Sequence, residues 1–271
     1  MTDLAMRLDA AVSGFAGRVG YALTNLTTGE RVLARADDLF PTASVVKLPI
    51  LTAFHAFVEA GEASWEETRE ITDADIPGGS GILQHLSFPR AISFRDAAWL
   101  MICHSDNLAT NLLLKTMTID GTNDLIRRVI GNNIRVDTYA GFQPDVPVQS
   151  MGQATPCALV RYLEDLAADR LPGATHTLDV ARMQFYHSMI PRYLPFQAYG
   201  HSPVRLANKT GALPGIRADI GLLATRRAQA AMVFMTAEST DTGFTFANEG
   251  EECIGTLAKI AYDAWMDGDE Q

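Results

Sequence analysis

The sequence has little lysine, little cysteine and no excess of positive charge, and each shortage narrows what the protein can do. Four of its 22 basic residues are lysines, so arginine carries most of the positive charge. The net charge is −10, which argues against nucleic acid or an anionic membrane as the main partner, because both bind basic surfaces. No tract of about 18 apolar residues occurs, so no transmembrane helix is expected.

Signals for a metal site and for export are also missing. The six histidines and the three cysteines (Cys103, Cys157 and Cys253) show no metal-ligand spacing, and the odd cysteine number fits a reducing compartment. The N-terminal MTDLAMRLDAAVSGF lacks an apolar stretch followed by a cleavage site and predicts an amphipathic helix instead. We therefore expect the chain as given to be cytoplasmic, or periplasmic or secreted if a signal segment has been removed. The oligomeric state stays open.

The hydrophobic pattern places strands at both ends of the chain. RVGYALTNLTTGERVLARA predicts a β-hairpin, and RLANKTG, ADIGLLAT and AQAAMVFMT predict strands that precede a C-terminal helix. The middle of the chain is mostly helical in pattern. We predict an α/β fold with an antiparallel sheet built from both termini and flanked by helices, with an inserted all-helical lobe. The sheet lobe would comprise residues 1–48 plus 205–271, the helical lobe residues 49–204, and the active site would lie between them.

The stretch FPTASVVKLPI, residues 40–50, places Ser44 three residues before Lys47 in an apolar run. Residues three apart on a helix share a face, so the hydroxyl and the amine can meet. Serine needs a neighbouring base to act as a nucleophile, and burial or a second cation can lower the pKa of a lysine enough to supply one. Arginine cannot lose its proton in this way, which explains a lysine in an arginine-rich chain. Taken alone, the pair also fits a surface lysine at a helix start.

A second polar segment, HSDNLATNLLLKTM, begins a predicted helix. Asp106 or Asn107 would cap a helix that starts at Leu108. This capping role accounts for the presence of either residue without any role in catalysis. Ser105 and Asn107 are two residues apart, so their side chains could both face one ligand only if this stretch forms a turn.

The third segment, LANKTGALPG, lies in a strand pattern. Gly211 permits the close approach of another backbone or of a ligand. Lys209 could bind a ligand or, equally, discourage strand pairing at a sheet edge. By itself this segment also has a purely structural explanation.

Together the three segments form an ordered set. S-x-x-K, S-D-N and K-T-G match the motifs of class A β-lactamases and penicillin-binding proteins, which the chain resembles over nearly its whole length. RVGYALTNLTTGE resembles the opening hairpin of these enzymes, and QATP resembles the entry to a later helix. The resemblance implies a β-lactamase/transpeptidase-like fold and a serine hydrolase with no metal or organic cofactor. Its substrate would be a small molecule with a carboxylate, such as a β-lactam.

The resemblance assigns a role to each motif residue. Ser44 would be the nucleophile that forms the acyl-enzyme, and Lys47 its base or proton relay. Ser105 would pass a proton to the leaving nitrogen, and Asn107 would bind the substrate amide. Lys209 would hold the substrate carboxylate and supply the positive potential that keeps Lys47 neutral.

Further substrate contacts are implied around the K-T-G segment. Thr210 and Gly211 would line the substrate site, and the backbone amides of Ser44 and Ala212 would form the oxyanion hole. Arg217 lies one residue out of register with an arginine that binds the substrate carboxylate in many family members.

The chain departs from the class A pattern where family members carry a deacylating glutamate. NNIRVDTYAGFQPDVPVQSMGQATP contains no glutamate, and the corresponding position falls near Tyr139 or Ala140. Asp137 and Asp145 are the nearest carboxylates. Asn111, which would brace the glutamate, is present.

The groups for acylation are therefore present, and a base for deacylation is not obvious. We expect an acyl-enzyme at Ser44 and β-lactam hydrolysis, slow if Lys47 or Asp137 must activate water. The alternatives are an acyl-trapping penicillin-binding-like protein, a hydrolase of another ester or amide, such as a serine-dependent glutaminase, and a non-catalytic protein that binds a carboxylate-bearing metabolite. The expected location argues against a cell-wall transpeptidase.

Overall fold

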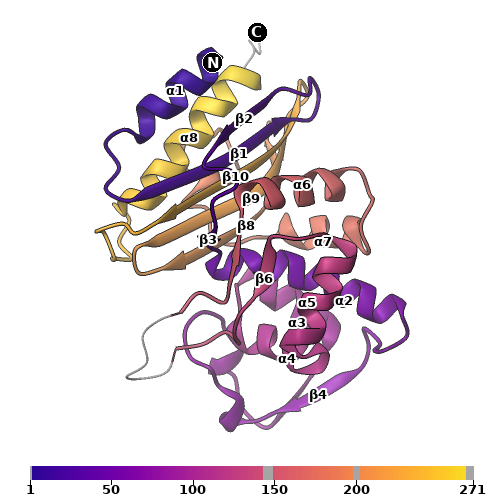
Figure 1. Ribbon diagram of the computed structural model, residues 1–271. Coiled ribbons are helices and arrows are strands. Elements are labelled where there is room, and N and C mark those ends of the chain that lie inside the picture. The colour runs from indigo at the N-terminus through magenta and orange to yellow at the C-terminus, as the bar shows by residue number, and fades with distance from the viewer. Residues whose placement is uncertain (1, 143–148, 198–201, 267–271) are drawn as a thin grey trace.

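A central antiparallel sheet joins the two ends of the chain. The computed structural model describes residues 2–142, 149–197 and 202–266. Within them the sheet has five strands in the order β2-β1-β10-β9-β8, so N-terminal and C-terminal strands are neighbours (Figure 1). The predicted α/β fold is confirmed. The strands are β1 (Arg18–Asn25), β2 (Arg31–Ala34), β8 (Arg205–Leu213), β9 (Ile216–Ala224) and β10 (Gln229–Ala237).

Helices cover both faces of this sheet. Helices α1 and α8 pack on one face, and α6 packs on the other, against β1, β9 and β10 (Figure 1). The described α-helices are α1 (Asp3–Val12), α2 (Lys47–Glu59), α3 (Phe94–Cys103), α4 (Asn107–Met117), α5 (Ile119–Val129), α6 (Pro156–Ala167), α7 (Ala174–Ala181) and α8 (Glu249–Trp265).

The strands of this sheet are buried on both faces, because a separate hydrophobic cluster packs on each face. In β10, Met232 and Phe234 belong to the cluster with α1 and α8, whereas Val233 and Met235 belong to the larger cluster that extends into the helices. Successive side chains of a strand point to opposite faces, which is why near-continuous apolar runs suit this sheet.

The middle of the chain is not all helical, so that prediction is wrong in one respect. Two small antiparallel sheets occur there, one formed by β4 and β5, the other by β3, β7 and β6. Their strands are too short for a period-2 pattern to stand out in the sequence. They are β3 (Phe40–Pro41), β4 (Thr68–Ile71), β5 (Arg90–Ser93), β6 (Ile134–Val136) and β7 (Gly152–Ala154). The division into two lobes stays a prediction.

Short 3₁₀ helices connect several of these elements. The first, η1, runs directly into α2, so this buried helix begins without a side-chain cap. The 3₁₀ helices are η1 (Ala43–Val46), η2 (Asp73–Asp75), η3 (Leu83–His85) and η4 (Ile190–Tyr193).

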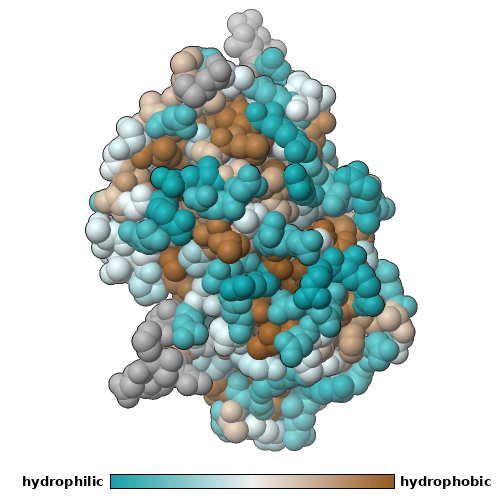
Figure 2. Space-filling view, viewed as in Figure 1, coloured by the Kyte–Doolittle hydropathy of each residue, from teal (hydrophilic) through white to brown (hydrophobic). Residues whose placement is uncertain are grey.

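The outer surface is mixed in character. Figure 2 shows hydrophilic residues over much of one face, with separate hydrophobic patches between them. Among the described helices, none combines the length and the apolar character that crossing a membrane would require.

Two histidines pack together where α2, α3 and α7 meet. His55 is 7% exposed, and its Nε2 lies 2.9 Å from Nδ1 of His176. The ring centroid of Trp65 lies 4.6 Å from that of His55. Gly173 leaves room for the imidazole, because a Cβ there would come within 2.1 Å of it. Burial, and then the neighbouring His176, lowers the pKa of His55 to about 4.

Acid should therefore destabilise the fold through His55. Its folded pKa lies below the ordinary 6.5, so the unfolded chain binds more protons between these values. The contribution of the uncharged imidazole to the free energy of unfolding is complete above pH 6.5. As the pH falls toward 4, that free energy decreases by at most about 3 kcal/mol. His55→Gln should flatten the pH dependence of the free energy of unfolding, measured with urea. The same substitution at exposed His85 should leave the slope unchanged, and equal slopes in all three proteins would contradict the account.

Candidate active site

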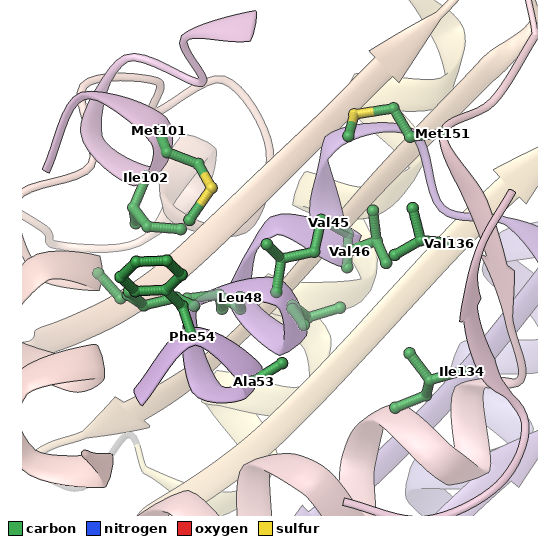
Figure 3. Close-up of a cluster of buried hydrophobic side chains, with 14 of the residues drawn as sticks. Val45, Val46, Leu48, Ala53, Phe54, Met101, Ile102, Ile134, Val136 and Met151 are labelled. Atoms are coloured by element: carbon green, nitrogen blue, oxygen red, sulfur yellow. The ribbon is translucent and has the colours of Figure 1, made fainter. Parts of the chain in front are cut away.

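Ser44 lies on a turn that the hydrophobic core holds in place. Its neighbours Val45 and Val46 are fully buried, and Figure 3 shows Val46 close to Val136 of β6. Ala43 has a φ of 44°, in the left-handed region that costs a non-glycine residue of order 1 kcal/mol. The turn keeps this conformation because surrounding groups fix it, including Ser150 Oγ, which accepts a hydrogen bond from Ala43 N at 2.9 Å.

Lys47 opens α2 and is completely buried. Its Nζ lies 2.7 Å from Ser105 O, 3.2 Å from Ser105 Oγ and 2.9 Å from Asn107 Oδ1. The backbone N–H of Lys47 donates to Ser44 O, but among the described residues no hydrogen bond joins Lys47 Nζ to the Ser44 hydroxyl. Ser105 is near both residues: its hydroxyl contacts the amine of Lys47, and it lines the same cavity as Ser44.

The surroundings of Lys47 favour its uncharged form. Burial, and then the neighbouring Lys209, hold the pKa of Lys47 well below its usual value, while Asp106 opposes them. Burial with a second cation nearby is the combination that the sequence predicts. A lysine in this state can accept a proton near neutral pH, which an arginine cannot do.

The K-T-G segment lies on β8, at the edge of the sheet. Lys209 is fully buried, and its Nζ donates to Thr210 O at 2.8 Å. Burial lowers the pKa of Lys209, and the carboxylate of Asp219 on the next strand opposes that shift. A Cβ at Gly211 would lie 2.7 Å from Thr42 O and 3.0 Å from Ser44 N. Glycine therefore lets β8 run directly against the amide of Ser44, a close approach of the kind that the sequence predicts.

The S-D-N segment combines structural and chemical roles. Asp106 is the N-cap of α4 and accepts a hydrogen bond from Ala109 N, so the helix begins one residue earlier than Leu108. Ser105 has a φ of 52°, a second strained position beside the cavity. Asn107 and Ser105 both line the cavity.

A glycine-rich loop supports these residues from the other side. Ser80 Oγ donates to Ser105 O at 2.7 Å, and Asn107 Nδ2 donates to Gly78 O at 3.0 Å. The motif G-G-S-G does not single out Ser80 in the sequence, because it is typical of any flexible turn.

Asn111 contacts one of the two positions, Tyr139 and Ala140, near which the counterpart of the missing glutamate falls. Asn111 Nδ2 donates to Ala140 O, and Ala140 N donates to Asn111 Oδ1, both at 2.8 Å. Ala140 also lines the cavity, so Asn111 braces the backbone of a cavity residue in this stretch. Asp137 pairs with Arg135 at 2.7 Å and is not among the described residues that line the cavity. Asp145 lies outside the described residues.

Arg217 is held by the protein itself. It is 1% exposed, and its guanidinium donates to the carbonyl oxygens of Leu213, Ile216 and Gly243. Its Nε donates to Glu251 Oε1 at 3.2 Å. Arg217 is also not among the described lining residues, so its predicted contact with a substrate carboxylate stays a prediction.

One cavity of about 550 Å³ is lined by five of the predicted residues, Ser44, Ser105, Asn107, Thr210 and Ala212. Gly211 and Arg217 are not among its described lining residues. Thr210 and Ala212 of β8 line it together with the two serines, and Lys47 and Lys209 lie buried beneath them. The described residues contain no cluster of side chains able to hold a metal ion. Sequence reasoning missed the cavity's aromatic and acidic walls, which come from distant segments: Phe142, Tyr186, Phe244 and Glu251.

Comparisons with known proteins agree with this arrangement. The profile of the beta-lactamase enzyme family matches residues 3–265. A beta-lactamase from Sphaerobacter thermophilus superposes with a TM-score of 0.84 at 28% identity, covering 96% of each chain. A mutant of PBP-A in an acyl-enzyme complex with penicillin G superposes with a TM-score of 0.83 at 22% identity, covering 97% of this chain and 96% of that one. An ancestral class A beta-lactamase reaches 0.83 at 21% identity, covering 97% and 100%.

Substituting Lys47 by arginine should abolish acylation of Ser44 while keeping a basic side chain at this position. A guanidinium stays protonated, so we expect a loss of at least about 100-fold, the scale of a lost general base. In the wild type, acylation should slow as pH falls through the pKa of Lys47, because the amine then gains its proton. Intact-protein mass spectrometry with an activated ester gives the rate. Lys115→Arg, at an exposed position on α4, is the control, and comparable rates for Lys47→Arg and this control would refute the role.

Proposed function

The chain belongs to the beta-lactamase enzyme family, and on that premise we propose that it is a serine hydrolase that β-lactams acylate at Ser44 and that releases the acyl group slowly. One observation carries this proposal. A fully buried lysine contacts Ser105 and Asn107 directly beneath the cavity that Ser44 faces, and a second buried lysine lies on the adjoining strand. The PBP-A relative captured with penicillin G supports β-lactams as the substrate class.

For acylation we propose a proton path through Ser105, whose hydroxyl contacts Lys47 Nζ and which lines the cavity with Ser44. The Ser44 hydroxyl attacks the amide carbonyl carbon, and its proton passes through Ser105 Oγ to the uncharged amine of Lys47. The backbone amides of Ser44 and Ala212 stabilise the oxyanion that forms. The intermediate then collapses, the C–N bond breaks, and the proton returns from Lys47 through Ser105 to the leaving nitrogen.

Deacylation is the slow half of the proposed reaction. It needs a base that removes a proton from water, and Ala140 offers a methyl group at the position where class A enzymes carry a glutamate. Lys47 is the remaining candidate base, but it lies 0% exposed beneath the cavity surface. We therefore propose that the acyl-enzyme accumulates.

Incubation with a fluorescent penicillin should label the wild-type protein on Ser44, and intact mass should rise by the mass of the added penicillin. Ser44→Ala should lose the label completely. Ser13→Ala, at an exposed position after α1, should keep it. A wild-type protein that forms no adduct with any β-lactam or activated ester would overturn the proposed function.

Replacing Ala140 by glutamate should speed the release of the acyl group. The new carboxylate would stand in the cavity on a backbone that Asn111 braces, where it can take a proton from water. We expect the adduct's lifetime to shorten by at least about tenfold, measured as the decay of the acylated mass after removal of free penicillin. Tyr139→Glu places the same charge on the exposed neighbour and should leave the lifetime unchanged. Equal lifetimes in both variants would contradict this account of slow turnover.

A further inference from the structure

A second cavity lies beside the first residues of β8, whereas the last residues of that strand line the cavity of Ser44. Its volume is about 300 Å³, at the lower end of the range found for small-molecule sites, roughly 300–1,000 Å³. It is bounded by the end of α7, by β8 and β9, and by the turn between β9 and β10. The two cavities share no described lining residue, so the chemistry proposed for Ser44 leaves this one without a role.

Positive charge is concentrated on this second cavity. Four of the chain's 18 arginines line it, and its described lining residues include no aspartate, glutamate or histidine. The chain as a whole has 32 acidic and 22 basic residues, so the cavity is opposite in sign to the protein. Guanidinium groups that share one cavity repel one another, and a bound anion would relieve that repulsion. The four residues are Arg182, Arg205, Arg226 and Arg227.

The backbone that carries these arginines is held by hydrogen bonds. Arg205 is the first residue of β8, which pairs with β9 along its whole length. In the turn between β9 and β10, Thr225 N donates to Ala228 O at 2.9 Å, and Thr225 Oγ1 accepts a hydrogen bond from Arg227 N at 3.2 Å. Arg182 follows α7 directly as its C-cap. Three separate segments therefore place their arginines around the cavity without needing a ligand to order them.

Two of the four arginines have no internal partner to give up. Arg205 and Arg226 are exposed, and neither side chain forms a hydrogen bond or an ion pair with any described residue. Arg182 pairs with Asp179, which compensates part of its charge. An anion that binds Arg205 and Arg226 therefore gains charged contacts without breaking existing ones.

The buried part of the cavity wall consists of small or apolar side chains. They are Ala207, Leu222 and Ala228, each at most 8% exposed. The two alanines leave space for a ligand between the arginines. A phosphate group has three terminal oxygens and can accept hydrogen bonds from several guanidinium groups at once, whereas a planar carboxylate matches one guanidinium fork. Arginines that reach one cavity from three segments therefore suit phosphate groups better than a carboxylate.

We propose that this cavity is a binding site for a small anion that carries two or more phosphate groups. Arg205 and Arg226 would supply the principal contacts, and Arg182 and Arg227 line the same space. More than one phosphate group is expected because more than one guanidinium lacks an internal partner. The site is separate from Ser44, so the inference does not depend on the proposed function.

Isothermal titration calorimetry with pyrophosphate tests this inference on the wild-type protein. The wild type should bind pyrophosphate. The double variant Arg205→Gln/Arg226→Gln should bind it at least about tenfold more weakly, because one hydrogen bond between charged groups is typically worth about that factor in affinity. Ser44→Ala should bind it as the wild type does, which separates this site from the acylation chemistry.

The matched control is the double variant Arg90→Gln/Arg128→Gln. It removes the same net charge at two exposed positions, on β5 and α5, that are not among the described lining residues of the cavity. Its affinity for pyrophosphate should stay within about twofold of the wild type, because charges far from the site are screened. The melting temperature of each variant shows that it folds.

ADP and citrate, used as further probes, identify the ligand class. Tighter binding of ADP than of pyrophosphate would support a nucleotide as the ligand, and tighter binding of pyrophosphate would support a free polyphosphate. Both results uphold the inference. Citrate carries three carboxylates and no phosphate, and it should bind more weakly than pyrophosphate.

Three results would overturn the inference. They are the absence of binding of both pyrophosphate and ADP at millimolar concentration, an unchanged affinity in Arg205→Gln/Arg226→Gln, and binding of citrate as tight as that of pyrophosphate. None of them bears on the proposed function, because acylation of Ser44 is measured independently.

Discussion

Two lysine side chains are buried near one another beneath the cavity, and the chemistry proposed for this protein depends on that arrangement. Removing an ammonium group from water is costly, and a second cation nearby raises the cost further. Burial, and then Lys209, lower the pKa of Lys47 and so favour its uncharged form, while oxygens of Ser105 and Asn107 surround the amine. An uncharged amine beside a serine hydroxyl is a base, so the same burial that strains the fold also prepares the reaction.

The fold brings these groups together from distant parts of the chain. Ser44 comes from η1 and Lys47 from the first position of α2, Ser105 and Asn107 come from the segment that leads into α4, and Lys209 comes from the edge strand β8. The edge strand can approach the turn because Gly211 has no side chain, and the turn resists displacement because its valines are embedded in the core. Ala43 and Ser105 both line the cavity, and both have strained backbone with a positive φ.

Much of this could be predicted from the sequence, because the motifs are local and their order is specific. The strands near both termini, the buried helix after Ser44 and the Lys47–Lys209 pair all have local signals. The sequence left two positions open for the missing glutamate, and of these Ala140 is the one that Asn111 contacts and that lines the cavity. The acidic wall could not be predicted, since Glu251 reaches Arg217 only when α8 packs beside β9. The short strands β4 to β7 were missed because a few residues carry no clear period.

The protonation state of Lys47 is the claim on which the account depends most. Because the chain has only four lysines, a protein labelled with ¹³C at the lysine ε-carbons gives a simple spectrum, and single arginine substitutions assign it. The account predicts that the Lys47 signal has the chemical shift of an uncharged amine at pH 7 and moves only when the solution is made more acidic. A Lys47 signal that titrates near the ordinary lysine value of about 10.4 would show a charged amine at neutral pH and would contradict it.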